Sequence, residues 1–154
     1  MKRFILDTGV TLLYIRGSSF YNEIEKENEL TNPESLILIS VVTKAELFSL
    51  AKQLNWQDEK KLQRLDKLLN ESLVIIDISK NDKALLDAYA EIDAYSQGKL
   101  LNKPLGTSSR NMGKNDLWIA ATAFVTNSTL ITLDGDFDHL HNTFVNVKKY
   151  TQVR

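Results

Sequence analysis

The chain has 154 residues, of which 43% are hydrophobic and 25% charged, with 6 glycines and 2 prolines. This composition excludes collagen-like, low-complexity and largely disordered chains, and the length fits one domain over residues 1–154. The 19 basic and 20 acidic residues give a net charge of −1, which excludes a uniformly basic nucleic-acid surface but allows a local basic patch.

Five short apolar runs rich in β-branched residues predict strands that are buried on both faces. They cover residues 3–6, 36–40, 73–79, 129–132 and 144–147. Between them, apolar residues at helical spacing predict helices, one of them over residues 43–54. The alternation of strands and helices predicts an α/β fold with a parallel sheet covered by helices on both faces.

A weakly patterned stretch at residues 97–114 contains three of the six glycines and is predicted to be a loop. No apolar run reaches the ~20 residues that a membrane-spanning helix needs, and Asp7 interrupts what would be the apolar region of a signal peptide. The chain has no cysteine, which excludes disulfides and thiolate chemistry and fits a reducing compartment. We therefore expect a soluble, cytoplasmic protein.

Four carboxylates are placed where the predicted parallel strands end. Asp7 follows the first strand, Glu46 lies early in the helix after the second, Asp116 begins an apolar helix, and Asp134 follows the strand 129–132. Ligands of open parallel sheets bind outside this edge, so we expect the four acids to converge there. Their repulsion is best offset by a divalent cation, and all-oxygen ligands favour Mg²⁺ or Mn²⁺.

Each acid also has a structural alternative. Thr43 and Glu46 match a capping box, and Asn115 followed by Asp116 matches an N-cap with an acid that complements the helix dipole. Residues 134–138 could form a polar turn. On these alternatives the acids share no site.

Spacing argues against other sites. An EF-hand beginning at Asp134 would lack its glycine and its glutamate, and the glycine spacing of residues 106–113 is too long for a P-loop. A phosphatase with an aspartyl nucleophile would need a second acid where Gly9 stands. His139 and His141 are predicted to be surface residues rather than zinc ligands.

Four segments resemble, in order and approximate spacing, the motifs of PIN-domain ribonucleases, closest to the VapC-like toxins of bacterial toxin–antitoxin modules. The segments are FILDTGV at 4–10, ISVVTKAEL at 39–47, GKNDLWIAATA at 113–123 and TLITLDGDFDHL at 129–140. The resemblance implies a three-layer α/β/α fold with a central parallel sheet, and RNA cleavage that depends on Mg²⁺ or Mn²⁺. It also implies a small antitoxin partner whose C-terminal tail crosses the acidic site, and it allows a homodimer.

The resemblance also implies roles for individual residues. Asp7, Glu46 and Asp116 correspond to the three central acids, and Asp134 to the fourth, with Asp136 as the competing candidate. Thr8 and Thr132 occupy the small hydroxyl positions that flank the site. Gly9 departs from the Asn or Ser that the family often has there.

The implied chemistry needs no side-chain nucleophile. Two cations roughly 3.5–4 Å apart would activate a water and stabilise the leaving oxygen. The basic residues of the segment 96–115, which contains no acid, are the candidate RNA contacts: Lys99, Lys103, Arg110 and Lys114. The alternative for this segment is a solvated loop, and the alternative for the whole protein is a non-catalytic α/β interaction module.

Overall fold

The computed structural model describes residues 1–152. At the centre of the fold lies a five-stranded, fully parallel sheet. The strands are β1 (Lys2–Leu6), β2 (Ser35–Ser40), β3 (Val74–Ile76), β4 (Thr129–Thr132) and β5 (Asn146–Lys149). Their spatial order is β3-β2-β1-β4-β5. The chain builds outward from β1 in one direction and from β4 in the other. The sheet therefore has a switch point between β1 and β4, where ligands of such folds bind.

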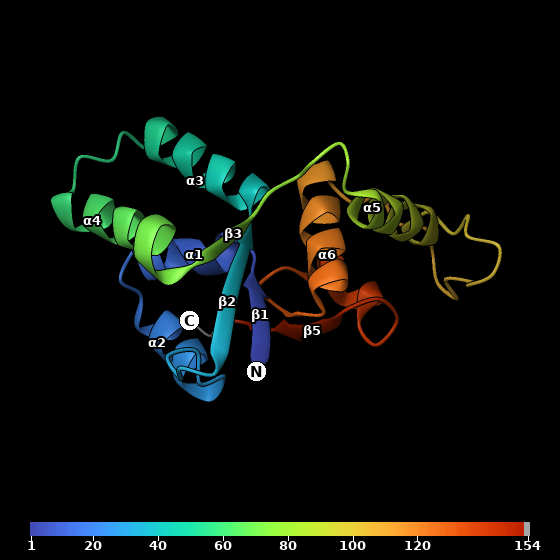
Figure 1. Cartoon of the computed structure of the whole chain (residues 1–154), viewed down its shortest axis with the longest axis horizontal. Coiled ribbons are helices and arrows are strands. Elements are labelled where there is room, and N and C mark those ends of the chain that lie inside the picture. Colours follow the sequence, from blue (N-terminus) through green and yellow to red (C-terminus); the bar gives the residue numbers. More distant parts are fainter. Residues whose placement is uncertain (153–154) are drawn as a thin grey trace.

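Helices cover both faces of the sheet (Figure 1). They are α1 (Thr8–Ile15), α2 (Ser19–Glu27), α3 (Val41–Gln53), α4 (Glu59–Lys67), α5 (Lys83–Ser96) and α6 (Lys114–Thr126). A π-helical turn, η1 (Leu68–Ser72), extends α4, and a 3-10 helix, η2 (Gly135–Leu140), follows β4. In Figure 1, α1 to α4 lie to the left of the sheet and α5 and α6 to its right. This arrangement confirms the three-layer α/β/α fold.

The alternation of side chains along β1 divides the core into two parts. Phe4 and Leu6 pack with residues of α1, α2 and η1, whereas Ile5 packs with residues of α5 and α6. All three side chains are buried, as a strand between two helical layers requires. The prediction of strands buried on both faces is therefore confirmed for the centre of the sheet.

Several element boundaries differ from those predicted. The strand expected at 73–79 is limited to β3, and the strand expected at 144–147 is shifted to β5. The shift has a packing cause, because the Phe144 ring lies edge-on against Tyr95, 5.2 Å between centroids, and pairing with β4 starts at Asn146. Helix α3 begins two residues early, because the Ser40 side chain caps it.

Helices α1 and α2 were not predicted. Helix α1 is short and largely buried, so its sequence carries little amphipathic pattern. The loop predicted at 97–114 is confirmed up to Gly113, since Lys114 begins α6. Among the described residues, no helix has the length and apolar character needed to cross a membrane.

Candidate metal centre

A cavity of about 400 Å³ opens at the carboxyl ends of β1 and β4. It is lined by the four acids predicted to converge there: Asp7, Glu46, Asp116 and Asp134. They come from four segments far apart in the chain, and the parallel sheet brings them together at its switch point. This convergence is the central geometric feature of the molecule.

Asp7 is the most deeply buried of the four, with 7% of its surface exposed. It caps α1, accepting a hydrogen bond at Oδ1 from the Val10 amide at 3.0 Å, and its Oδ2 accepts from the Thr132 hydroxyl. Burial raises the pKa of Asp7, the two hydrogen bonds oppose that increase, and nearby Asp134 and Glu46 add to it. The hydrogen bonds hold the carboxylate in one orientation.

Glu46 does not act as a helix cap. Ser40 caps α3 by accepting from the Val42 amide at 3.1 Å, so Thr43 lies inside the helix and the capping-box interpretation is wrong. The Thr8 hydroxyl instead donates to Glu46 Oε1 at 2.8 Å. Thr8 and Thr132 thus each hold one carboxylate of the cavity.

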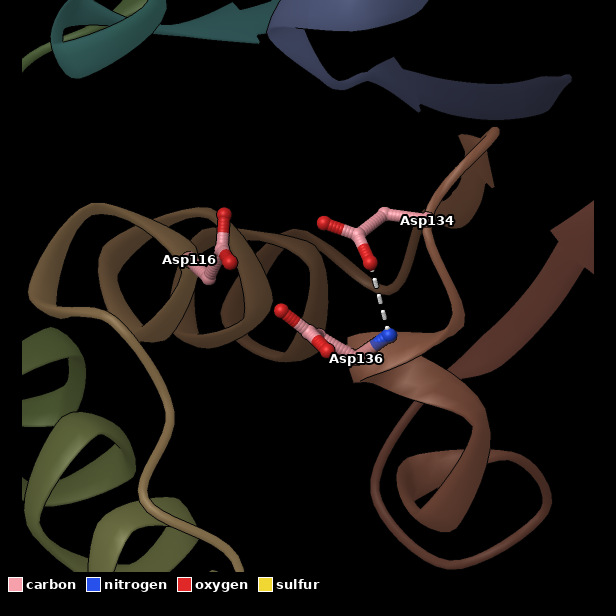
Figure 2. A group of neighbouring side chains, drawn as sticks. All are labelled: Asp116, Asp134 and Asp136. Carbon is pink, nitrogen blue, oxygen red and sulfur yellow. Dashed lines mark hydrogen bonds between the residues drawn. The ribbon is translucent and has the colours of Figure 1, made fainter.

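Asp116, Asp134 and Asp136 each offer one oxygen to a cluster whose atoms all lie within 4.8 Å of one another. Figure 2 shows Asp116 on α6, Asp134 just before η2 and Asp136 in its first turn, with the carboxylates directed into a shared space. The Asp136 amide donates to Asp134 Oδ1 at 2.9 Å, and the Asp134 amide donates to the Thr132 hydroxyl at 2.9 Å. The loop is therefore locked to the end of β4.

The N-cap predicted at Asn115 is also wrong, because Gly113 is the N-cap of α6, whereas Asp116 does lie in the first turn of this helix. Burial and the neighbouring carboxylates together raise the pKa of Asp116 to about 6. Burial is the largest cause, followed in descending order by the carboxylates of Asp134, Asp136, Asp7 and Glu46. The negative charges of the other acids of the site therefore all act on Asp116.

These residues fit a divalent metal ion. The neighbouring carboxylates raise the pKa of Asp116, a repulsion that a cation between them would offset, and the cluster offers oxygen ligands alone. Hard oxygen ligands suit Mg²⁺ or Mn²⁺ rather than Zn²⁺. Asp134 lines the cavity with Asp7 and Glu46, and Asp136 belongs to the cluster with Asp116 and Asp134, so both candidates for the fourth acid are within reach of a shared ion.

The four predicted RNA contacts occupy different positions. Arg110 is beside the acids, with Nη1 donating to the Gly135 carbonyl at 3.4 Å. Lys103 lies over the Phe144 ring, 4.4 Å from its centroid. Lys99 and Lys114 are exposed at the two ends of the loop. Of the four, Arg110 is thus the one with a hydrogen bond to the loop that carries Asp134 and Asp136.

Two features near the acids were not predicted from the sequence. Lys149, at the end of β5, forms an ion pair with Asp138 at 2.6 Å beside the acidic loop. Its position at the carboxyl end of a strand could have indicated a residue near the acids. The boundary predicted for that strand was wrong, so this position was not recognised. The surface prediction is wrong for His139, which is half-buried with Nε2 2.7 Å from the Ser96 hydroxyl, whereas His141 is exposed.

The metal-free protein is expected to lose stability as the pH rises between 3.8 and about 6. The folded-state pKa of Asp116 lies above its unfolded value, so the folded state binds the proton more tightly, and the penalty is complete once both states are charged. The pKa of Asp7 is raised as well, so Asp7 contributes to the same pH dependence. The contribution of Asp116 is measured as the difference between the melting temperatures of the wild type and Asp116→Asn at each pH. A difference that does not change with pH would contradict this assignment.

A model of the PIN domain family matches residues 4–142. The chain therefore belongs to the PIN domain family, as its four sequence segments suggested. Comparison with curated protein sequences gives no match.

Solved structures resemble the chain along almost its whole length. A chain of VapBC2 from Rickettsia felis, bound to a DNA fragment from its promoter, is 26% identical with a TM-score of 0.67, covering 94% of this chain and 98% of that one. VapBC-5 from Mycobacterium tuberculosis, described as a member of a toxin–antitoxin family, is 22% identical with a TM-score of 0.60, covering 99% and 100%. FitAcB from Neisseria gonorrhoeae is 22% identical with a TM-score of 0.61, covering 94% and 95%.

Proposed function

We propose that this protein is a single PIN domain that acts in the cytoplasm as a Mg²⁺- or Mn²⁺-dependent endoribonuclease, the toxin of a toxin–antitoxin module. The observation that carries the proposal is the convergence of four acids, from four separate segments, on one cavity at the switch point of the sheet. A non-catalytic interaction module would have no need to gather carboxylates whose charges raise the pKa of Asp7 and Asp116.

The likeness to known structures supports a protein partner. The chain shares its fold and 26% identity with a chain of VapBC2, and VapBC-5 belongs to a family of toxin–antitoxin systems. An antitoxin that places its C-terminal tail across the acidic cavity would block both the metal ligands and the path of the substrate. Co-purification with the product of a neighbouring small reading frame tests this part of the proposal.

In the proposed mechanism, bound Mg²⁺ or Mn²⁺ supplies Lewis acidity and an activated water. The chain holds its ligands ready before binding: Thr132 and the Val10 amide orient Asp7, and Thr8 orients Glu46. Arg110 lies where it can neutralise a substrate phosphate beside the acids. Preorganised charge, rather than a side-chain nucleophile, would supply most of the rate.

The direct test is cleavage of RNA by the purified protein. We expect cleavage with Mn²⁺ or Mg²⁺, none after EDTA, and recovery when the metal is restored. Intact RNA under all metal conditions, from a folded protein freed of any partner, would favour the non-catalytic module. Because the assay follows the wild type alone, it does not depend on which acid binds the ion.

Replacing the four basic residues of the 97–114 segment with glutamine is expected to weaken RNA binding and flatten its salt dependence. Each lost phosphate contact lowers the slope by ~0.7 for single strands. Arg110→Gln alone should account for a larger share than Lys103→Gln, because Arg110 lies beside the acids and Lys103 lies over Phe144. An unchanged slope in the quadruple variant, measured by fluorescence anisotropy, would show that the segment is a solvated loop.

A further inference from the structure

Lys149 lies at the carboxyl ends of the parallel strands, where the acids also lie. It is the last residue of β5 and is paired in register with Thr132 of β4, whose hydroxyl donates to Asp7. Register partners in a parallel ladder point to the same face, so Lys149 continues the row that runs from Asp7 through Thr132. This row crosses three neighbouring strand ends.

The ammonium group of Lys149 is turned toward the acidic loop. Its Nζ lies 2.6 Å from Asp138 Oδ2, and 3.8 Å from the position that a Cβ on Gly135 would occupy. Gly135 separates Asp134 from Asp136, and its carbonyl accepts from Arg110. Two cations from distant segments therefore meet at the single glycine between two candidate metal ligands.

The ion pair with Asp138 does not account for this placement by itself. The side chains of Lys149 and Asp138 are 38% and 43% exposed, and ion pairs at such exposure contribute little to stability. An ammonium group has three donors, and the hydrogen bond to Asp138 uses one. The other two donors could bind a ligand with oxygen acceptors.

The adjacent Lys148 provides the contrast. It points to the other face of the sheet, where its Nζ donates to Asn28 Oδ1 at 2.7 Å, beside the end of α2. Both lysines thus donate to a polar side chain, but Lys149 alone of the pair lies at the acidic loop. This difference makes Lys148 a matched control.

We propose that Lys149, held in place by Asp138, binds a phosphate of the RNA strand next to the acidic cavity and shares that task with Arg110. This inference rests on the proposed function, since it assigns a contact to the same substrate. A cluster of carboxylates repels a polyanion, so a strand that reaches them needs cations at the rim of the site. Arg110 and Lys149 supply positive charge from the two segments that adjoin Gly135.

The test is the salt dependence of binding to a fluorescent single-stranded RNA of twelve nucleotides, in EDTA so that metal-dependent cleavage is stopped. Lys149→Gln is expected to lower the slope by ~0.7 and to weaken binding about fivefold near 0.1 M salt, which is the counterion contribution of one contact. Lys149→Arg should restore the slope, and Lys148→Gln should leave it unchanged. Asp138→Asn should also keep the slope, because it leaves the lysine charge in place.

The outcomes separate binding from a merely structural ion pair. If Lys149→Gln and Asp138→Asn lower the melting temperature alike and neither changes the slope, the pair is structural and the inference is overturned. Equal slopes for Lys149→Gln and Lys148→Gln overturn it as well. Cleavage by the wild type with Mn²⁺ is measured separately, so a failure of the proposed function is seen without reference to Lys149.

Discussion

Replacing Asp7 or Asp116 with asparagine is expected to lower metal-dependent RNA cleavage by at least ~10²-fold. The substitution removes a negative charge from the cavity and keeps the volume of the side chain. Asp7→Asn also weakens the acceptor of the Thr132 hydroxyl, so it disturbs orientation as well as charge. Single-turnover cleavage of one RNA, with melting curves for every variant, measures the effect on folded protein.

The control for this experiment is an acid outside the site. Asp87→Asn removes a carboxylate from an exposed pair with Lys83 on α5, and it should leave cleavage unchanged. Asp134→Asn and Asp136→Asn are compared in the same assay to identify the fourth acid. We expect Asp134 to matter more, because it lines the cavity with Asp7. Full activity in both Asp7→Asn and Asp116→Asn would refute the site.

The second large effect concerns stability rather than rate. Above pH 6, Asp116→Asn is expected to raise the melting temperature of the metal-free protein, because it relieves repulsion from the surrounding carboxylates and the cost of burying a charge. For a domain of this size, each kcal/mol of relief corresponds to about 2–4 °C. Saturating Mg²⁺ or Mn²⁺ should stabilise the wild type by about 2.7 kcal/mol at a hundredfold excess over the dissociation constant. The variant should respond much less.

The opposite sign would identify a different role for Asp116. An acid that merely complements the dipole of α6 contributes up to ~1 kcal/mol, so its removal would destabilise the protein and leave the metal response intact. Thermal melts with metal and with EDTA, on wild type and variant, distinguish the two roles without any activity assay. That result would remove Asp116 from the proposed metal centre.

Predictability from the sequence differed among the elements. Strands β1, β2 and β4 were predicted to within one residue, because buried parallel strands have a strong apolar signal. Helix α1 was missed, since burial on most sides removes the contrast between polar and apolar faces. The last strand was predicted too early in the chain. The apolar residues Phe144 and Val145 pack in the core with residues of α5 and α6 and do not pair with β4.

The four acids line one cavity, as the sequence predicted. Their hydrogen-bond partners were not predicted. The sequence suggested that Glu46 belongs to a capping box, but Ser40 caps the helix. Glu46 instead accepts a hydrogen bond from the Thr8 hydroxyl. His139 could not be separated from a surface histidine, because its contact with Ser96 joins residues 43 positions apart. Side-chain partners of this kind arise from packing between distant segments.

By itself, the sequence determined the layer order of the fold and the strand ends at which its acids lie, because apolar periodicity and position along a strand are local properties. Only the tertiary structure decided that β1 and β4 are neighbours, and hence that Asp7 and Asp134 share one cavity. It also decided that Arg110 and Lys149, 39 positions apart in the printed sequence, both reach Gly135. The physical reason is that charge convergence depends on strand order and loop docking, which are set by long-range packing rather than by neighbours in the chain.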